Sequence, residues 1–220
     1  MRLEHLFRDR AEAGQVLADR LTKAIGGQDI LVLALPRGGV PVGFEVAQAF
    51  RADLDVFLVR KLGVPGHEEL AMGAIASGGV RVLNHALIEQ LGIPAMAVDR
   101  VTEREQREIS RREVLYRKGR PPLSTTKRTV VLVDDGLATG ATMLAAVRAL
   151  RAQHPERIVV AVPVASADVC GEFREHVDQI VCAETPEPFQ AVGIWYEDFS
   201  QTTDDEVREL LERAAHMHVG

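Results

Sequence analysis

The chain has few aromatic residues and little cysteine. Phe, Trp and Tyr make up 5% of its 220 residues, and there are two cysteines. Cys170 and Cys182 lie in apolar surroundings without metal-ligand spacing, which favours buried thiols over a disulfide or a zinc site. The sequence therefore does not indicate a disulfide-stapled secreted domain, and the reducing cytoplasm is the predicted location.

Long apolar runs and an excess of positive charge are also absent. No apolar stretch approaches the length that spans a bilayer, and the first ten residues place charge where a signal peptide has its apolar core. The formal net charge is −6 and the sequence pI is about 5.7, whereas nucleic-acid-binding proteins generally present a basic surface. The composition thus predicts neither a membrane partner nor a nucleic-acid partner.

The most informative stretch is VVLVDDGLATGATM, residues 130–143. An apolar run typical of a buried strand leads into Asp134 and Asp135, and a helical pattern begins near Met143. Backbone N–H groups of a loop with little side-chain bulk can surround a phosphate in front of a helix N-terminus. Because carboxylates repel a neighbouring anion, the acidic pair is predicted to face neutral groups such as sugar hydroxyls. The small loop residues are Ala138, Thr139, Gly140, Ala141 and Thr142.

This stretch resembles the phosphoribosyl pyrophosphate signature of type I phosphoribosyltransferases, most closely in its adenine-type version. The resemblance implies that Asp134 and Asp135 hold the 2′ and 3′ hydroxyls of the ribose, and that loop 138–142 holds the 5′-phosphate. Two alternatives are an ordinary strand–turn–helix unit and an acidic strand end that holds magnesium for a nucleoside triphosphate. The second is disfavoured because the motif G-x-x-x-x-G-K-[ST] occurs nowhere in the sequence.

A second strand, loop and helix are predicted near the start of the chain. The buried strand 30–35 runs directly into Pro36-Arg37-Gly38-Gly39. The two glycines allow backbone amides to approach an anion, and Arg37 offers a planar fork for oxygen ligands. The resemblance identifies this turn as the short pyrophosphate-binding loop, which often has unusual backbone geometry in the family. An ordinary turn is the alternative.

Residues 54–59 are predicted to form the next strand, ending in Arg60 and Lys61. Two cations at the carboxyl end of a strand suit the neutralisation of a leaving group, and they resemble a basic pair found in some family members. A solvated strand end explains them equally well. The glycine-rich stretch Gly63 to Gly73 is predicted to be a loop, at the position where the family has a mobile lid.

The C-terminal part contains an unusual concentration of aromatic residues between Pro188 and Phe199. It resembles, loosely and with a one-residue insertion, the C-terminal segment of the hypoxanthine-guanine branch. That resemblance implies that Phe189 and Trp195 cover a base and that Asp198 lies near the metal. Packing in the core explains the aromatic cluster equally well.

The expected fold is α/β: a Rossmann-like, mostly parallel sheet with helices on both faces and a small hood. Residues 1–220 are predicted to be one phosphoribosyltransferase domain, with a helical insertion at about 84–120 and a C-terminal hood or tail at about 184–220. The hood is expected to combine the 63–73 loop, a long charged helix at 95–118 and the tail.

The implied reaction moves a 5-phosphoribosyl group from magnesium-bound phosphoribosyl pyrophosphate to a nitrogen base, with release of pyrophosphate. Ala138 stands where hypoxanthine-guanine members have a second acidic residue, so the acceptor stays open, a purine or related base being a candidate. A homodimer is a candidate assembly. The alternative is a non-catalytic regulator on the same fold that senses phosphoribosyl pyrophosphate or a nucleotide. The residues implied in catalysis are Asp134, Asp135, Arg37 and Lys61, and those implied in pyrophosphate binding are Arg37, Gly38, Gly39, Arg60 and Lys61.

Overall fold

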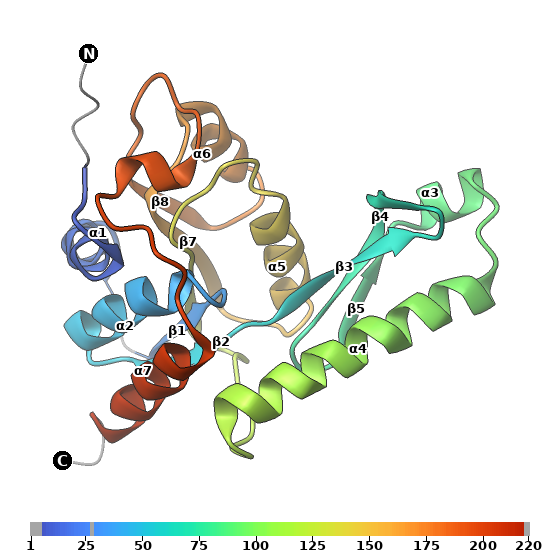
Figure 1. Ribbon diagram of the computed structural model, residues 1–220, viewed down its shortest axis with the longest axis horizontal. Helices are drawn as coiled ribbons and strands as arrows, with labels where there is room; N and C mark the ends of the chain where they lie inside the picture. Colours follow the sequence, from blue (N-terminus) through green and yellow to red (C-terminus); the bar gives the residue numbers. More distant parts are fainter. Residues whose placement is uncertain (1–5, 27–28, 218–220) are drawn as a thin grey trace.

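The computed structural model describes residues 6–26 and 29–217, which form two sheets and their covering helices (Figure 1). One sheet has five parallel strands in the order β2-β1-β6-β7-β8, and the other has three antiparallel strands in the order β3-β4-β5. The strands are β1 (Ile30–Ala34), β2 (Asp53–Val56), β3 (Val59–Val64), β4 (His67–Ala76), β5 (Val80–Leu83), β6 (Thr129–Val133), β7 (Arg157–Val164) and β8 (Gln179–Glu184). The helices are α1 (Arg10–Ala24), α2 (Gly39–Phe50), α3 (His85–Gln90), α4 (Ala95–Arg117), α5 (Ala141–Arg151), α6 (Ala167–Phe173), the short 3-10 helix η1 (Val192–Trp195) and α7 (Asp204–His216).

The five-stranded sheet has two buried faces, because successive side chains of a strand point to opposite sides. In β6, Val131 and Val133 belong to the core cluster shared with α1, α2 and α7. Val130 and Leu132 belong to the cluster shared with α5 and α6. The predicted Rossmann-like, mostly parallel sheet with helices on both faces is confirmed.

Strands β1 and β6 end at the same level, and β7 continues three residues further. Ala34 of β1 is the register partner of Val133 of β6, which in turn pairs with Ala161 of β7, and the backbone N–H of Leu35 continues the ladder by donating to the carbonyl of Val133. The loop after β1 and the loop after β6 therefore begin side by side at the carboxyl edge of the sheet. Open α/β sheets bind ligands at this edge.

Elements β3, β4, β5, α3 and α4, residues 59–117, form a separate unit, here called the lobe, that projects to one side of the five-stranded sheet (Figure 1). The antiparallel sheet of the lobe contacts α4 and also contacts α5 of the main sheet. Leu62 and Met72 are fully buried in this packing. The predicted long helix is confirmed in α4, and α3 and α4 lie within residues 84–120.

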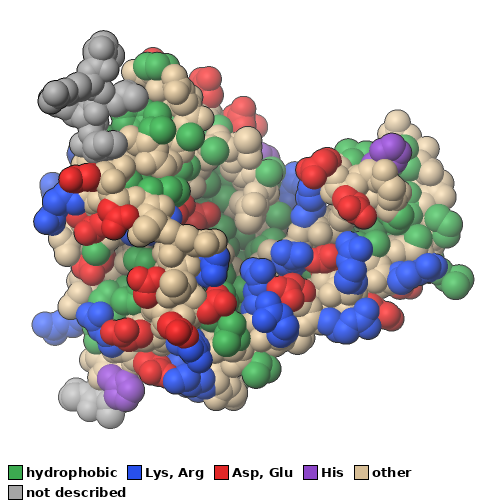
Figure 2. All heavy atoms as spheres, in the orientation of Figure 1, with side chains coloured by type: hydrophobic (Ala, Val, Ile, Leu, Met, Phe, Trp, Pro, Cys, Tyr) green, Lys and Arg blue, Asp and Glu red, His purple; other side chains and the backbone are tan. Residues whose placement is uncertain are grey.

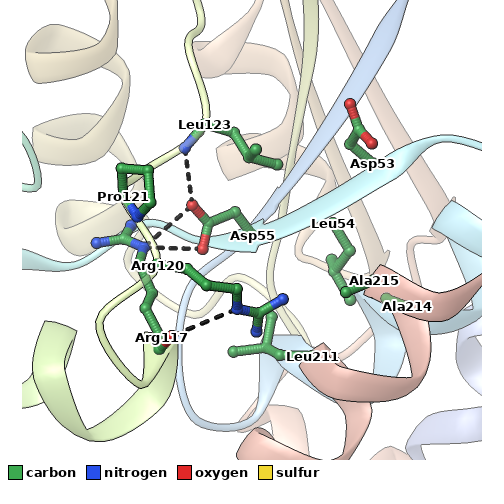
Figure 3. Close-up of a pocket in the computed structure, with 10 residues that line it drawn as sticks. All are labelled: Asp53, Leu54, Asp55, Arg117, Arg120, Pro121, Leu123, Leu211, Ala214 and Ala215. Atoms are coloured by element: carbon green, nitrogen blue, oxygen red, sulfur yellow. Dashed lines mark hydrogen bonds and ion pairs between the residues drawn. The ribbon is translucent and has the colours of Figure 1, made fainter. Parts of the chain in front are cut away.

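A buried ion pair anchors the end of α4 to the main sheet. The guanidinium Nε of Arg117 lies 3.0 Å from Oδ1 of Asp55 on β2, and the terminal nitrogen donates to the carbonyl of Val56 at 2.9 Å. The backbone N–H of Leu123 also donates to Asp55, at 3.2 Å, as Figure 3 shows. Asp55 and Arg117 are 6% and 4% exposed, so both charges are compensated inside the protein rather than by water.

The predicted strand 54–59 is wrong in its second half. β2 ends at Val56, and Arg60 and Lys61 belong to β3 of the antiparallel sheet. The break occurs because Leu58 exchanges hydrogen bonds with Ser77, whose backbone N–H donates to the Leu58 carbonyl and whose hydroxyl accepts from the Leu58 N–H. The two cations therefore do not sit at the carboxyl edge of the five-stranded sheet.

The predicted loop from Gly63 to Gly73 is also wrong. β3 and β4 form a hairpin that turns at Pro65 and Gly66, so most of this stretch is strand. The glycine at position 73 permits close strand approach, because a Cβ there would lie 2.4 Å from the carbonyl oxygen of Val82. Glycine content indicated a loop where the structure uses glycine for packing.

The two cysteines form a disulfide, which corrects the prediction of buried thiols. Cys170 on α6 and Cys182 on β8 have Cα atoms 6.6 Å apart and are bonded through sulfur. The pairing arises because α6 packs against β8, a contact that the twelve-residue spacing in sequence does not reveal.

The C-terminal tail packs on the main sheet unit, and its helix α7 also contacts α4 of the lobe. Trp195 and Tyr196 join Phe7, Ala13 and Val164 in one apolar cluster, and α7 contacts α2 and β2. A capping box at Thr203 and Glu206 starts α7. None of the described helices is long and apolar enough to cross a membrane.

Candidate functional site

Two loops meet at the carboxyl edge of the five-stranded sheet. The loop after β1 crosses directly over the end of β6: a Cβ at Gly38 would lie 2.0 Å from Oδ2 of Asp135, and a Cβ at Gly39 would lie 2.8 Å from the Val133 carbonyl oxygen. Any larger residue at either position would collide with its neighbours. The peptide bond between Pro36 and Arg37 is cis.

The loop after β6 leads directly into the N-terminus of α5. Leu137 extends the strand by donating its N–H to the carbonyl of Val164, and Gly140 then starts the helix with φ +69°, a conformation that favours glycine. A Cβ at Gly140 would also lie 2.5 Å from the Phe173 ring. Because glycine carries no capping side chain, the first amides of α5 stay available to an anion. The exposed loop residues are Ala138, Thr139, Ala141 and Thr142.

The acidic pair is held in a desolvated environment. Burial, with the neighbouring charge of Asp135 as the next cause, raises the pKa of Asp134 well above its ordinary value. Burial likewise raises the pKa of Asp135, although Arg10 acts in the opposite direction. Oδ1 of Asp134 accepts the backbone N–H of Asp135 at 2.9 Å. Perturbed carboxylates at a sheet edge are typical of functional sites.

Arg10, which sequence reasoning missed, holds Asp135. Its Nε donates to Oδ2 of Asp135 at 2.9 Å, and its terminal nitrogen donates to the carbonyl of Ser200 at 2.7 Å. The guanidinium also lies 4.0 Å from the centre of the Phe199 ring. The first residue of α1 thus joins the acidic pair to the tail, across 125 positions in sequence. No local sequence pattern marks so distant a contact.

The tail supports the same loop from its other side. The hydroxyl of Tyr196 donates to the backbone carbonyl of Asp135 at 2.6 Å, and a Cβ at Gly136 would lie 2.5 Å from Val192. Burial raises the pKa of the Tyr196 hydroxyl, so the side chain remains a neutral donor.

Arg37 lies beside the start of α7. One of its terminal nitrogens is 3.7 Å from Oδ1 of Asp204, which also accepts the hydroxyl of Tyr116 at 2.6 Å. The Arg37 side chain is one-third exposed and follows directly after β1. It therefore sits on the same edge as Gly38 and Gly39.

Arg60 and Lys61 lie on the lobe. Arg60 donates to Glu105 of α4 at 2.8 Å, and Lys61 donates to the backbone carbonyl of Glu69 at 3.1 Å. Both line a cleft of about 1090 Å³ that also borders Ala141 and Thr142.

The aromatic residues singled out in the tail are packed rather than open. Trp195 is 5% exposed, and Phe189 packs against the cluster that contains it. Asp198 is exposed, and the hydrogen bond that it accepts from the backbone N–H of Ser200 lowers its pKa. Arg10 donates hydrogen bonds both to the Ser200 carbonyl and to Asp135, so Asp198 is connected to Asp135 through Ser200 and Arg10.

Among residues 6–26 and 29–217, no cluster of three or more His, Cys, Asp or Glu side chains is able to hold a metal by itself. Mg²⁺ bound through substrate phosphates needs only one or two protein carboxylates. The adjacent carboxylates Asp134 and Asp135 fit that requirement. The edge as a whole offers amide donors for an anion beside two acceptors for hydroxyl groups.

Known proteins resemble this chain in sequence and in fold. Residues 8–194 match the family model for the phosphoribosyl transferase domain. Two curated proteins from Mycobacterium tuberculosis strains, whose names assign them provisionally to the phosphoribosyl transferases, are 48% identical over 209 residues. The matched region covers 95% of this chain and 47% of theirs, so the chain spans about half the length of these relatives.

A crystal structure of the Thermus thermophilus protein TT1426 has 41% sequence identity and a TM-score of 0.85, with 94% of this chain and 98% of that chain covered. A Neisseria gonorrhoeae protein solved with bound ppGpp matches at a TM-score of 0.50, with 93% of this chain and 92% of that chain covered. Its sequence identity of 14% shows a shared fold alone. By the match over residues 8–194, the chain belongs to the family of the phosphoribosyl transferase domain.

Proposed function

We propose that this chain transfers a 5-phosphoribosyl group from magnesium-bound phosphoribosyl pyrophosphate to a nitrogen base and releases pyrophosphate. The observation that carries the proposal is the close approach of the Gly38 backbone to the Asp135 carboxylate. This contact brings the loop after β1, the loop after β6 and the acidic pair together at one site. Family membership supports the same reaction class.

In this proposal the donor lies across the edge of the sheet. The amides at the start of α5 and the hydroxyls of Thr139 and Thr142 bind the 5′-phosphate, where the helix N-terminus attracts negative charge. Asp134 and Asp135 accept hydrogen bonds from the two ribose hydroxyls. Arg10 orients Asp135 and favours its ionised form, which accepts the stronger hydrogen bond.

The pyrophosphate lies against the loop of Arg37, Gly38 and Gly39. Arg37 is assigned the stabilisation of negative charge that develops on the leaving group. Magnesium, when bound with the donor, supplies further neutralisation of that charge, with Asp134 and Asp135 as the protein ligands and Asp198 as a candidate contact. Arg60 and Lys61 remain candidates for the leaving group, at a greater remove because they lie on the lobe.

The acceptor is proposed to approach from the tail side of the edge, where the exposed Phe199 ring stacks on the largely buried guanidinium of Arg10. Phe189 and Trp195 support this wall from within the apolar cluster rather than by presenting open faces. The proposal names the acceptor only as a nitrogen base.

The test is an incubation of the protein with magnesium, phosphoribosyl pyrophosphate and a pool of purines, pyrimidines and aromatic amines. Mass spectrometry then identifies any phosphoribosylated product. We expect one product, absent with Asp135→Asn, and a donor affinity reduced by about tenfold to a hundredfold in that variant, the cost of a charged hydrogen bond.

The outcomes separate the proposal from its alternative. A product made equally well by Asp135→Asn would refute the assigned ribose contact. Donor binding by calorimetry with no product from the pool would instead favour a regulator that senses the donor. Arg174→Gln, which removes an exposed charge on the far end of α6, is the matched control and should behave as the wild type.

A further inference from the structure

The cleft between α5 and the β3–β4 hairpin has a positively charged lining. Its volume of about 1090 Å³ reaches the upper end of the range for ligand pockets. Asp134, Asp135 and Arg37 do not line it, and it shares only Ala141 and Thr142 with the phosphate loop. Figure 2 shows the notch between the main body and the lobe. The charged residues that line the cleft are Arg60, Lys61, Arg104, Arg148, Glu68 and Glu105.

Two of these arginines are fixed in place by one carboxylate. Nε of Arg60 and Nε of Arg104 donate to Glu105 at 2.8 and 2.9 Å, and Glu105 is 6% exposed. Burial opposes ionisation of Glu105, but the two hydrogen bonds outweigh it and lower its pKa. The terminal nitrogens of both arginines donate to no other residue in the described part of the chain. Two guanidinium groups thus keep free donors in a preorganised arrangement.

A third arginine faces the same cleft from α5. Arg148 is exposed and makes no hydrogen bond or ion pair with any residue that the structure describes. Its charge lies opposite the lobe, so the cleft carries cations on both walls. Guanidinium groups on opposite walls suit a ligand with several anionic oxygens, because each guanidinium can donate two parallel hydrogen bonds to a phosphate.

Apolar side chains also line the cleft. Val82 and Leu83 of β5 line one side, and Leu144 of α5 lines the other. A flat ring fits between branched aliphatic side chains, whereas an inorganic anion gains nothing from them. The combination of charge and apolar surface therefore favours an organic phosphate over a simple anion.

We propose that this cleft is a second ligand site, which binds a nucleotide-like organic phosphate through Arg104 and Arg148 and holds its ring between Val82 and Leu144. The ligand bridges the lobe and α5. Because Ala141 and Thr142 border the cleft and also begin α5, an occupied cleft restrains the helix end at which the donor phosphate is proposed to bind.

Titration calorimetry with ATP, GTP and inorganic tripolyphosphate tests the proposal. We expect at least one nucleotide to bind the wild type, Arg104→Gln and Arg148→Gln each to weaken it about tenfold, and tripolyphosphate to bind less tightly than the nucleotide. Asp135→Asn should leave this affinity unchanged, because Asp135 lies outside the cleft. Arg174→Gln removes one positive charge elsewhere and should change the affinity less than twofold.

Three results would overturn the proposal. The first is that neither nucleotide binds the wild type at millimolar concentration. The second is that the Arg104→Gln, Arg148→Gln double variant binds the nucleotide as tightly as the wild type does. The third is that Asp135→Asn abolishes nucleotide binding, which would place the nucleotide at the sheet edge. Arg148 is exposed, so Arg148→Gln should unfold at the same temperature as the wild type, whereas Arg104→Gln removes one of the two arginines that hold Glu105 and should be slightly less stable. A thermal unfolding curve of each variant shows that it is folded at the temperature of the binding measurement.

Discussion

The buried carboxylates of the lobe and its anchor and the partly buried carboxylates of the sheet edge have opposite environments. In the lobe, Glu105 forms ion pairs with Arg60 and Arg104, and at the anchor of the lobe Asp55 forms an ion pair with Arg117. Each of these buried negative charges is therefore compensated by a neighbouring positive charge. At the edge, Asp134 has only the backbone N–H of Asp135 as a hydrogen-bond donor in the described residues, and a second carboxylate lies next to it. The pKa of Glu105 is accordingly lowered, and that of Asp134 is raised.

This difference separates structure from function. A compensated buried charge fixes the position of two elements relative to each other, as Arg117 does for α4 and β2. An incompletely compensated pair keeps acceptor capacity for a ligand and reduces the stability of the empty protein. Figure 2 shows many charged side chains on the surface of the lobe. Among the ion pairs of α4, Arg117 with Asp55 is buried and is of the first kind, whereas Glu108 with Arg112 is partly exposed to solvent.

The largest effect is expected from removing the anchor. Arg117→Met leaves Asp55 buried without its cation and should lower the free energy of unfolding by about 3–5 kcal/mol, as measured by urea denaturation. Combining it with Asp55→Leu should recover much of the loss, because no uncompensated charge then remains. A double variant as unstable as the single one would show that Arg117 acts by packing alone.

An intermediate effect is expected from filling the contact between the two loops. Gly38→Ala places a methyl group on the Asp135 carboxylate and should weaken the binding of phosphoribosyl pyrophosphate on the order of a hundredfold, the usual result of displacing a site group by about 1 Å. Calorimetry is the measurement. Gly26→Ala is the control, because a Cβ there meets nothing within 4 Å. Equal donor affinities in the two variants would contradict the joined-loop site.

The smallest effect concerns the raised pKa of Asp134. Asp134→Asn removes a carboxylate that folding holds in an unfavourable environment, so at pH 7 it should raise the free energy of unfolding by about 1 kcal/mol while weakening donor binding about tenfold.

The pH dependence has a definite sign. Because the folded-state pKa of Asp134 lies above the unfolded value, the wild type loses stability as pH rises from about the ordinary value of 3.8 through the folded-state pKa. The advantage of Asp134→Asn should therefore be full at neutral pH and vanish below pH 3.8. Denaturation curves from pH 3 to pH 8 measure it, and an advantage that grows toward acid would refute the assignment.

Sequence patterns predicted the main sheet because burial dictates them directly. A continuous apolar run such as 130–133 indicates a strand with both faces covered, which is typical of a parallel sheet between helices. The small residues after Asp135 indicate the tight turn that joins this strand to the next helix. Helix capping is equally local: Asp9 caps α1 by accepting the backbone N–H of Glu12, three residues on, at 2.8 Å. Strand burial, tight turns and helix caps depend on residues that are close in sequence, which is why the sequence predicts them.

The β3–β4 hairpin of the lobe escaped prediction because the local pattern of glycines indicated a loop, whereas glycines such as Gly73 permit close approach to the neighbouring strand. The pairing of Cys170 with Cys182 depends likewise on how α6 settles on β8.

The sequence by itself determined the parallel sheet, the acidic pair at its edge and the loop of small residues that leads into α5, since each follows from side chains that are neighbours along the chain. Only the tertiary structure decided that Arg10 holds Asp135, that Gly38 touches the same carboxylate, and that the cations of the lobe face α5 across a cleft. Such contacts form when burial of two sheets brings together residues up to 125 positions apart, and no spacing within one segment encodes them.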